Sequence, residues 1–189
     1  RCCKDKVAFA ENFHVIETYA NMMNPPVLVE PVDDGYVQIN PTYPPADEKE
    51  MDSFWDLPFT KLPHPRYKGK HIPAFEMIKF SINTHRGCFG GCNFCTIAAH
   101  QGKFIQSRSE ESIIKEIRGL NDLPGFAGNI SDVGAPTANM YGMKGKDREL
   151  CMKCRRKSCL FPSPCRNMDR SHERLLRLYE RIAAVKGIR

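Results

Sequence analysis

The sequence has 189 residues, of which 41% are hydrophobic and 26% are charged, with a net charge of +6. This length suits one ordinary domain or a little more, and the composition is globular rather than disordered. No apolar run approaches the roughly 20 residues of a membrane helix, no signal peptide opens the chain, and nine cysteines are an odd number for a disulfide-stapled protein. Membrane, fibrous and small secreted classes are therefore excluded, and we expect a cytoplasmic protein.

The first 70 residues predict a small α+β segment. Apolar residues recur at helical spacing from Val7 to Met23, which predicts a helix there. Two short apolar runs then flank Asp33-Asp34-Gly35, a pattern typical of a β-hairpin with the glycine at positive φ. Ten of the 14 prolines lie between Pro25 and Pro73 and exclude long helices. We therefore expect residues 41–70 to form an extended, wrapping stretch with one short helix near Asp47–Trp55.

From residue 71 onward the pattern becomes strand, loop, helix, strand, loop, helix. Alternating apolar residues predict a strand over Met77–Asn83, followed by a Gly/Cys-rich loop over residues 84–106. The next helix has either Ser107 or Ser109 as its N-cap, and Ser107 would form a capping box with Glu110. The apolar face of that helix carries four aliphatic residues, Ile113, Ile114, Ile117 and Leu120.

The remaining elements complete an alternating β/α order. A second, weaker strand is predicted within residues 125–134, and a last amphipathic helix begins after Asp169 or Ser171. Alternating strands and helices imply a parallel sheet with crossover helices. The predicted fold class is therefore α/β.

Cys88, Cys92 and Cys95 lie within eight residues, as Cys-x3-Cys-x2-Cys, directly after the predicted strand. Three soft thiolates this close can bind one metal centre, and the neighbouring glycines let the backbone fold tightly around it. A [4Fe–4S] cluster held by three cysteines keeps one iron open for a small ligand, whereas an electron-carrying cluster takes four. The alternatives are a structural zinc site completed by His85 or His100, or cysteines that bind no metal. Zinc ligands usually come in two separated pairs, so the triplet favours the iron–sulfur cluster.

This motif and its surroundings resemble a known family. The three cysteines, with aromatic Phe94 before the last one, resemble the signature of the radical S-adenosylmethionine (SAM) superfamily. The stretches FSINTHRGCFGGCNFCTIAAHQGKFIQSRS and SDVGAPTANMYG, with the later cysteines, resemble YgiQ-like radical SAM proteins over nearly the whole chain. The resemblance implies an N-terminal α+β segment over residues 1–70 with its Pro-rich stretch. Residues 71–189 would then hold the opening βα units of a partial (β/α) radical SAM barrel, with a second Cys-rich loop inserted at 144–168.

The resemblance also implies a cofactor set and a reaction. Cys88, Cys92 and Cys95 would hold a [4Fe–4S] cluster whose open iron binds SAM. One electron from a flavodoxin- or ferredoxin-type donor would cleave SAM reductively to a 5′-deoxyadenosyl radical, which abstracts hydrogen from a substrate that the sequence does not reveal. Only two βα units are predicted, fewer than a barrel needs, so we expect this chain by itself to be inactive.

Three further residues are implied as SAM contacts. Phe94 would pack near the adenine. Radical SAM proteins commonly have a Gly-Gly-Glu-like stretch after the second strand, facing the amino group of SAM, and this sequence departs from it. It offers Asp132 and Gly134 in a related position. The alternative is that these two are ordinary turn residues.

A second cysteine group follows, consisting of Cys151, Cys154, Cys159 and Cys165. Four thiolates within fifteen residues can saturate either a structural zinc ion or an auxiliary iron–sulfur cluster, and the spacing does not separate the two. Reduced thiols without a metal are the remaining alternative. A saturated site would order its loop or pass electrons without binding substrate.

The basic excess leaves a rival function open. Residues 144–189 carry 14 Lys and Arg against 5 Asp and Glu, a balance of +9. This charge can compensate metal-bound thiolates, or it can attract a polyanion. The rival is thus a non-catalytic Cys-rich metal module with a basic, nucleic-acid-binding tail. The basic residues around the first cysteine loop are either solvated surface or a cationic wall for a carboxylate; they are His85, Arg86, His100, Lys103 and Arg108.

Overall fold

The computed structural model describes residues 4–189, which form two compact units that each collect segments far apart in sequence. Unit 1 consists of Arg1–Pro45, Gly87–Ile105 and Met143–Arg170, and unit 2 of Ala46–Arg86, Gln106–Gly142 and Ser171–Arg189. The fold is mixed α/β with small sheets, and the described residues contain no closed barrel. The partial barrel and the domain boundary near residue 70 both stay predictions.

Unit 1 begins with the helix that the sequence predicts. The helix α1 (Lys6–Ala20) starts after Asp5, whose carboxylate accepts hydrogen bonds from the backbone N–H groups of Val7 and Ala8 at 3.0 and 3.1 Å. This cap satisfies donors that the first turn of a helix leaves unpaired. Most of its apolar side chains are exposed, including Phe9 at 60%.

The predicted hairpin is also present, with one difference in its turn. The strands β1 (Leu28–Val32) and β2 (Gly35–Ile39) pair antiparallel, and Val32 lies opposite Gly35. The positive φ therefore falls on Asp33, at 49°, and the prediction that Gly35 takes it is wrong. The turn is only two residues long, so the glycine already belongs to the strand, and aspartate is among the residues that tolerate this conformation.

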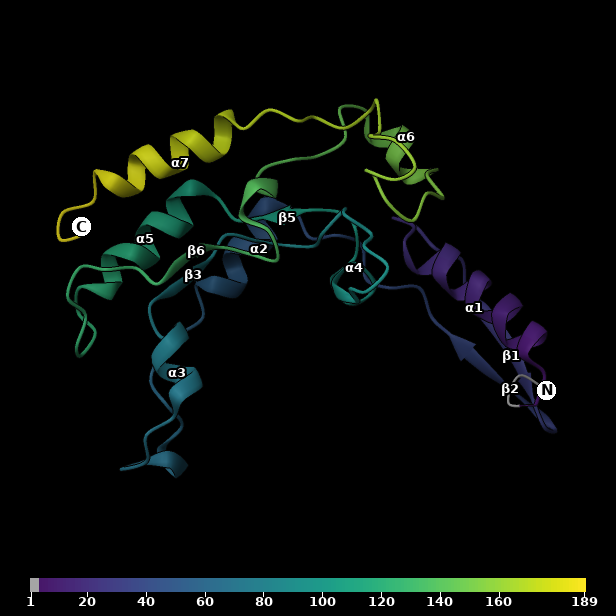
Figure 1. The fold of residues 1–189 in the computed structure, drawn as a ribbon, viewed down its shortest axis with the longest axis horizontal. Helices are drawn as coiled ribbons and strands as arrows, with labels where there is room; N and C mark the ends of the chain where they lie inside the picture. The colour runs from purple at the N-terminus through teal and green to yellow at the C-terminus, as the bar shows by residue number, and fades with distance from the viewer. Residues whose placement is uncertain (1–3) are drawn as a thin grey trace. The chain divides into compact units, whose positions relative to one another are not determined.

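The remaining segments of unit 1 carry the cysteines and contain little regular structure. They include two five-residue helices, α4 (Ile97–Gln101) and α6 (Arg148–Met152), which Figure 1 shows in teal and green. An isolated bridge between Gly145 and Met168 closes the loop that contains the second cysteine group. Most of the backbone around the cysteines is therefore loop, positioned by specific hydrogen bonds.

Unit 2 begins with three short helical segments. The helix α2 (Glu48–Trp55) confirms the predicted short helix and is capped by Asp47. It is followed by the 3-10 turn η1 (Pro65–Tyr67) and the helix α3 (Pro73–Ile78). The helix α3 takes the first two residues of the strand predicted over Met77–Asn83, and only Ser81–Asn83 form a strand. A proline in the first turn favours a helix start, and so short an alternating pattern does not separate strand from helix.

Two of the three small sheets lie in unit 2. The strands β3 (Ser81–Asn83) and β6 (Asp132–Gly134) pair parallel, which confirms the predicted parallel arrangement at the scale of one strand pair. The strands β4 (His85–Arg86) and β5 (Gln106–Ser107) pair antiparallel, within the stretch that the sequence predicted as loop. Strands this short lie below the length at which hydrophobic alternation can be recognised.

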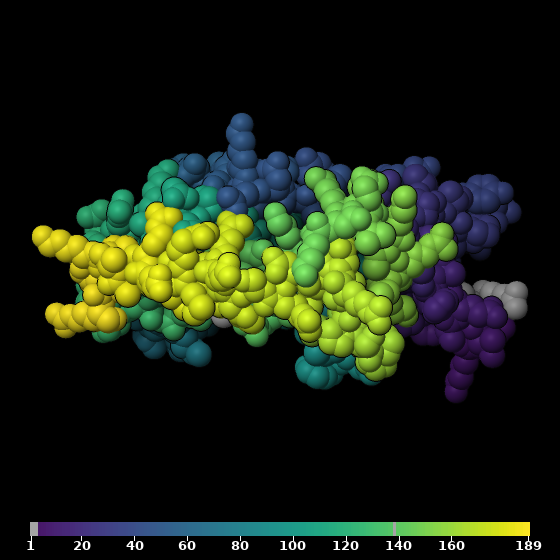
Figure 2. Space-filling model, turned by 90° about the horizontal axis from the view of Figure 1, so that it is seen from above, coloured from purple at the N-terminus to yellow at the C-terminus, as the bar shows by residue number. Residues whose placement is uncertain are grey.

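Two helices cover these strands and supply the core. The helix α5 (Glu110–Leu120) is capped by Ser109, whose hydroxyl accepts from the backbone N–H of Ser112 at 3.0 Å, so the alternative cap at Ser107 is wrong. The helix α7 (Glu173–Ala183) packs beside α5 (Figure 1), and Figure 2 shows it in yellow at the surface. The buried cluster consists of Ile82, Ile113, Ile114, Ile117, Leu120, Tyr141, Leu175, Leu178, Ile182 and Val185. No helix in the described part of the chain could span a membrane.

A buried ion pair joins the elements of unit 2. The Arg108 side chain is 1% exposed and pairs with the Glu116 carboxylate of α5. Its guanidinium also donates to the Asn83 carbonyl at 2.7 Å and to the Ser112 hydroxyl at 2.9 Å, and it lies 4.8 Å from the centre of the Trp55 ring. Together these contacts link β3, α5 and α2. A further 3-10 turn, η2 (Ala138–Met140), precedes the segment that returns to unit 1.

Candidate metal centre

The loop of Cys88, Cys92 and Cys95 is shaped by glycines that no other residue could replace without strain. Gly87 has a φ of +94°, and a Cβ there would lie 2.3 Å from the Phe104 carbonyl oxygen. Gly91 has a φ of +65°, and a Cβ there would lie 2.7 Å from the Cβ of Ser158. Both positions require a left-handed backbone and a close approach to another segment, and only glycine satisfies both. These glycines therefore fix the path of the chain on either side of Cys88.

The three thiols lie on an accessible loop. A Cβ at Gly90 would lie 3.5 Å from the Cys88 sulfur and 3.7 Å from the Cys92 sulfur, so both sulfurs flank the same point. The Cys95 N–H donates to the Cys92 carbonyl at 3.1 Å, and the Cys88 N–H donates to the Gly102 carbonyl at 3.0 Å. Cys88 and Cys95 are half-buried and Cys92 is exposed. The loop thus brings two sulfurs together and leaves one edge open.

The residues implied as SAM contacts lie in different units. Phe94 belongs to unit 1 and is 91% exposed. Asp132 and Gly134 belong to β6 of unit 2, where Asp132 is exposed and the Gly134 carbonyl accepts from the Thr84 N–H at 2.8 Å. The contact of each of these three residues with SAM therefore remains a prediction.

Three of the five basic residues around the loop are buried. His85 is 0% exposed, and Lys103 and Arg108 are each 1% exposed, so the solvated-surface interpretation is wrong for them. Arg86 and His100 are exposed. Burial lowers the pKa of His85 to about 4, so its imidazole is neutral at physiological pH. Its Nδ1 lies 2.9 Å from the Thr84 hydroxyl.

The second cysteine group lines a single cleft in unit 1. Cys151, Cys154, Cys159 and Cys165 all border it, and all four are half-buried. Two backbone bonds hold the group together, from the Cys154 N–H to the Cys151 carbonyl at 3.1 Å and from the Cys165 N–H to the Cys159 carbonyl at 2.7 Å. Burial and the neighbouring thiols raise the pKa of Cys151 and Cys159. The sequence grouped these residues by spacing, and the structure brings them together.

The two cysteine groups contact each other within unit 1. The Cys159 N–H donates to the Phe89 carbonyl at 3.1 Å. The Ser158 hydroxyl donates to the Phe89 and Gly90 carbonyls at 3.1 and 2.8 Å, and Ser158 also contacts the Gly91 position. The first loop is therefore supported by the second, although about sixty residues separate them in sequence.

The chain is similar in sequence to known proteins over its whole length. Residues 1–81 match the family model described as Radical SAM N-terminal. The UPF0313 protein of Bacteroides thetaiotaomicron is 52% identical over 188 residues, covering 100% of this chain and 30% of the relative. The UPF0313 protein YgiQ of Escherichia coli is 47% identical over 186 residues, covering 98% of this chain and 25% of the relative. The chain is a homologue of the UPF0313 proteins, and its first 81 residues match the radical SAM N-terminal family. It spans less than a third of the length of these curated relatives.

The radical SAM family that residues 1–81 match implies a [4Fe–4S] cluster, and the donor set of the first loop fits one. Cys88, Cys92 and Cys95 supply three thiols from one short loop, and Gly90 leaves the backbone beside the Cys88 and Cys92 sulfurs without a side chain. Each cysteine of such a cluster binds a different iron, so the sulfurs need not meet at one point. Across residues 4–189, no three His, Cys, Asp or Glu side chains converge as a single metal ion would require. The assignment of the cluster to these cysteines therefore rests on donor chemistry and remains a prediction.

Sequence reasoning missed the residues that surround the second cysteine group. The Lys103 ammonium donates to the Arg156 carbonyl and lies 3.6 Å from the Cys154 sulfur. The Asn167 amide donates to the Cys151 sulfur at 3.3 Å. Residue spacing could not predict the Lys103 contacts, because Lys103 lies some fifty residues from its partners in sequence. Folding brings these side chains to the thiols of the second cysteine group.

Proposed function

We propose that this chain contributes the cluster-binding part of a radical SAM enzyme. Cys88, Cys92 and Cys95 each bind one iron of a [4Fe–4S] cluster, and the fourth iron stays open for SAM. The observation that carries the proposal is the three-thiol loop in a homologue of the UPF0313 proteins. Glycines hold this loop at positive φ angles that other residues would adopt only with strain. When bound, the cluster and SAM supply a one-electron reductive cleavage that yields a 5′-deoxyadenosyl radical.

The residues of the chain position and shield that chemistry. Phe94 presents its exposed ring next to Cys95, where it can stack on the adenine of SAM. Gly134 lies at the carboxyl end of the parallel pair β3–β6, the end at which barrel enzymes bind ligands, and Asp132 begins the same strand two residues earlier. In the proposed function this pair forms the opening strands of a partial barrel, and Asp132 accepts from the SAM amino group.

The partners follow from the same chemistry. The reaction consumes one electron, so a flavodoxin- or ferredoxin-type donor is required, and the cluster needs a reducing compartment such as the cytoplasm. Several arginines of the basic segment already have internal partners. Arg177 and Arg181 pair with Glu110, Arg174 pairs with Glu48, and the Arg156 side chain donates to backbone carbonyls. These contacts disfavour the rival role as a nucleic-acid-binding tail.

Anaerobic reconstitution of the full chain with iron and sulfide tests the proposal. Electron paramagnetic resonance of the reduced cluster should change when SAM is added, because SAM binds the open iron directly. The triple variant Cys88→Ala, Cys92→Ala, Cys95→Ala should lose this response completely. Phe94→Ala should keep the cluster and weaken SAM binding by roughly tenfold, since stacking on an aromatic ring contributes about 1–3 kcal/mol per base. A SAM response that survives in the triple variant would refute the assignment.

A further inference from the structure

The second cysteine group is surrounded by contacts that suit metal-bound thiolates. A Cβ at Gly145 would lie 2.2 Å from the Cys151 sulfur, so this sulfur packs directly against the backbone. The same sulfur accepts from the Asn167 amide, whose nitrogen also donates to the Asp147 carbonyl at 2.8 Å. Donors that are held in place in this way orient metal ligands and stabilise their negative charge. The Cys151 sulfur is therefore already held between the Gly145 backbone and the Asn167 amide.

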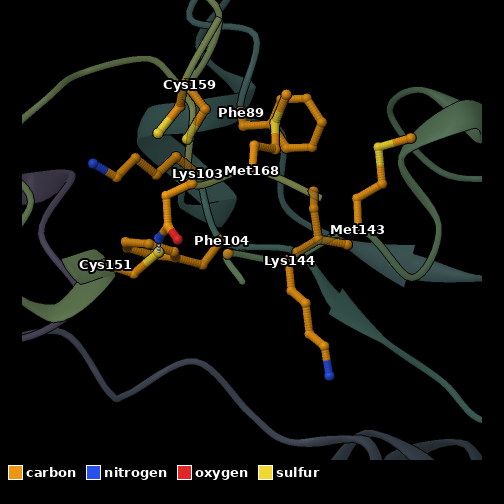
Figure 3. Close-up of a pocket in the computed structure, with 12 residues that line it drawn as sticks. Phe89, Lys103, Phe104, Met143, Lys144, Cys151, Cys159 and Met168 are labelled. Carbon is orange, nitrogen blue, oxygen red and sulfur yellow. Dashed lines mark hydrogen bonds between the residues drawn. The ribbon is translucent and has the colours of Figure 1, made fainter. Parts of the chain in front are cut away.

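Lys103 provides an independent indication. Its side chain is 1% exposed and runs between Cys151 and Cys159 in Figure 3. Among residues 4–189, no Asp or Glu side chain forms an ion pair with it; its ammonium contacts the Arg156 carbonyl and the Cys154 sulfur. A buried ammonium without an anion is costly. The groups around it that can become anionic are the thiols of the cleft.

Charge arithmetic connects these observations. Four thiolates with a zinc ion or a [4Fe–4S] core of charge 2+ leave a net charge of −2 at the site. A lysine ammonium buried beside the cysteines offsets part of this charge, and the metal in turn gives the ammonium its counter-ion. With neutral thiols, the Lys103 ammonium keeps its hydrogen bond to the Arg156 carbonyl but has no anionic partner among residues 4–189.

We propose that Cys151, Cys154, Cys159 and Cys165 hold a second thiolate-bound metal centre, with Lys103 as its buried counter-charge. The ligand is a thiophilic metal: either an iron–sulfur cluster, whose cysteines each bind a different iron, or a zinc ion, which would draw the thiols closer together than they lie in this structure. Ser158 and the Cys159 backbone connect this centre to the loop of Cys88–Cys95, so the centre orders the support on which that loop rests. The centre does not depend on the first cluster or on SAM.

The first test uses the unaltered full chain. Anaerobically purified protein is loaded with iron and sulfide, or with zinc alone, and the alkylation of each cysteine by iodoacetamide is followed by mass spectrometry. The four thiols of the second group should be protected together and should become reactive together when a chelator removes the metal. Equal alkylation rates before and after metal removal would overturn the proposal.

The second test separates this centre from the first. The Cys88→Ala, Cys92→Ala, Cys95→Ala variant should still bind about one zinc, or about four irons with sulfide, per chain. Either metal supports the proposal and identifies the centre. If this variant keeps its circular dichroism and binds neither metal, the second centre does not exist, whatever the outcome for the first cluster.

The third test addresses Lys103 by comparison with Lys144. Both lysines line the pocket of Figure 3, but Lys144 is exposed and its ammonium points away from the cysteines. Lys103→Met should weaken zinc binding roughly 10- to 100-fold, the range typical of residues that support metal ligands, and Lys144→Met should leave it unchanged. The metal-free Lys103→Met chain should lose no stability, because the substitution removes an unpaired buried charge. Equal zinc affinity in the two variants would refute the role of Lys103.

Discussion

The two units of this chain are stabilised in different ways. Of the 16 buried hydrophobic residues in the described part of the chain, unit 2 holds 12 and unit 1 holds only Ala8, Phe89, Met143 and Met168. Each fully buried aliphatic side chain contributes about 1.5–3 kcal/mol, so unit 2 has a core that can support its fold. Unit 1 instead has seven described cysteines, glycines at positive φ and side-chain-to-backbone hydrogen bonds.

This difference indicates which unit needs a bound ligand for its stability. A segment that buries little apolar surface cannot offset the conformational entropy lost on folding unless something else holds it. In unit 1 the proposed metal centres take that place, and the same loops carry the chemistry. Unit 2 supplies strands and helices whose order comes from packing. The comparison therefore predicts that metal acts on unit 1 and that core substitutions act on unit 2.

The largest expected effect is metal removal. Structural zinc binding contributes about 10–16 kcal/mol in small zinc-dependent domains, because the unfolded chain has no preformed site. Stripping the metal should raise protease cleavage between Leu150 and Arg170 by at least about tenfold, while α5 and α7 stay resistant. Limited proteolysis with fragment mass mapping measures both regions in one experiment. Equal resistance of residues 150–170 with and without metal would remove the contrast between the units.

The next largest effect concerns the buried ion pair of unit 2. Glu116→Gln leaves Arg108 buried without its anion, which should cost about 3–5 kcal/mol. The matched control is Lys115→Ala on the same helix, since Lys115 pairs with Asp56 in an exposed position and should contribute about 1 kcal/mol or less. Urea unfolding followed by the fluorescence of Trp55, the sole tryptophan of the chain, reports on unit 2. Similar losses for both variants would contradict the burial argument.

A smaller loss is expected from truncating the core of α7. Leu178 is 0% exposed, and Leu178→Ala should destabilise unit 2 by about 2–5 kcal/mol through lost burial and the cavity that remains. Leu176 lies two residues away on the same helix and is 59% exposed, so Leu176→Ala should change stability by about 0.5 kcal/mol or less. Neither variant should change the metal content of unit 1. A metal loss in Leu178→Ala would show that the two units are not independently stabilised.

Sequence reasoning succeeded where a residue pattern has a local cause. The face of α5, the parallel pairing of β3 and β6 and the grouping of the cysteines all follow from periodicity or spacing. It failed where tertiary contacts decide. The helix α3 took the first two residues of a predicted strand, Ser109 rather than Ser107 became the cap, and Asp33 took the positive φ expected of Gly35.

In the candidate site, too, the sequence predicted the residues that follow a local pattern and not the contacts made by folding. Cysteine spacing identified both groups, because ligands to one centre must lie close together along a short loop. It could not identify the contacts of Lys103, Ser158 and Asn167: Lys103 and Ser158 reach partners 51 and 68 residues away in sequence, and Asn167 lies 16 residues from Cys151. It also described Lys103 and Arg108 as potential surface residues, although long cationic side chains can be buried wherever the fold supplies a partner.

The smallest expected effect is a pH dependence confined to unit 2. His85 is fully buried, and burial lowers its pKa from 6.5 to about 4. Between these values the unfolded chain binds a proton that the folded chain excludes, so the stabilisation is complete above pH 6.5 and is lost as the pH falls toward 4. From pH 7.5 to pH 5 the loss should be about 1–2 kcal/mol. His85→Gln removes the titrating group, so the stability difference between the wild type and this variant, measured by Trp55 fluorescence in urea, should shrink or reverse over that range. Since carboxylates and other histidines titrate in both proteins, their contributions cancel in the difference. A stability difference that stays constant from pH 7.5 to pH 5 would mean that folding does not lower the pKa of His85. The imidazole would then be in contact with water despite its position in the core of unit 2.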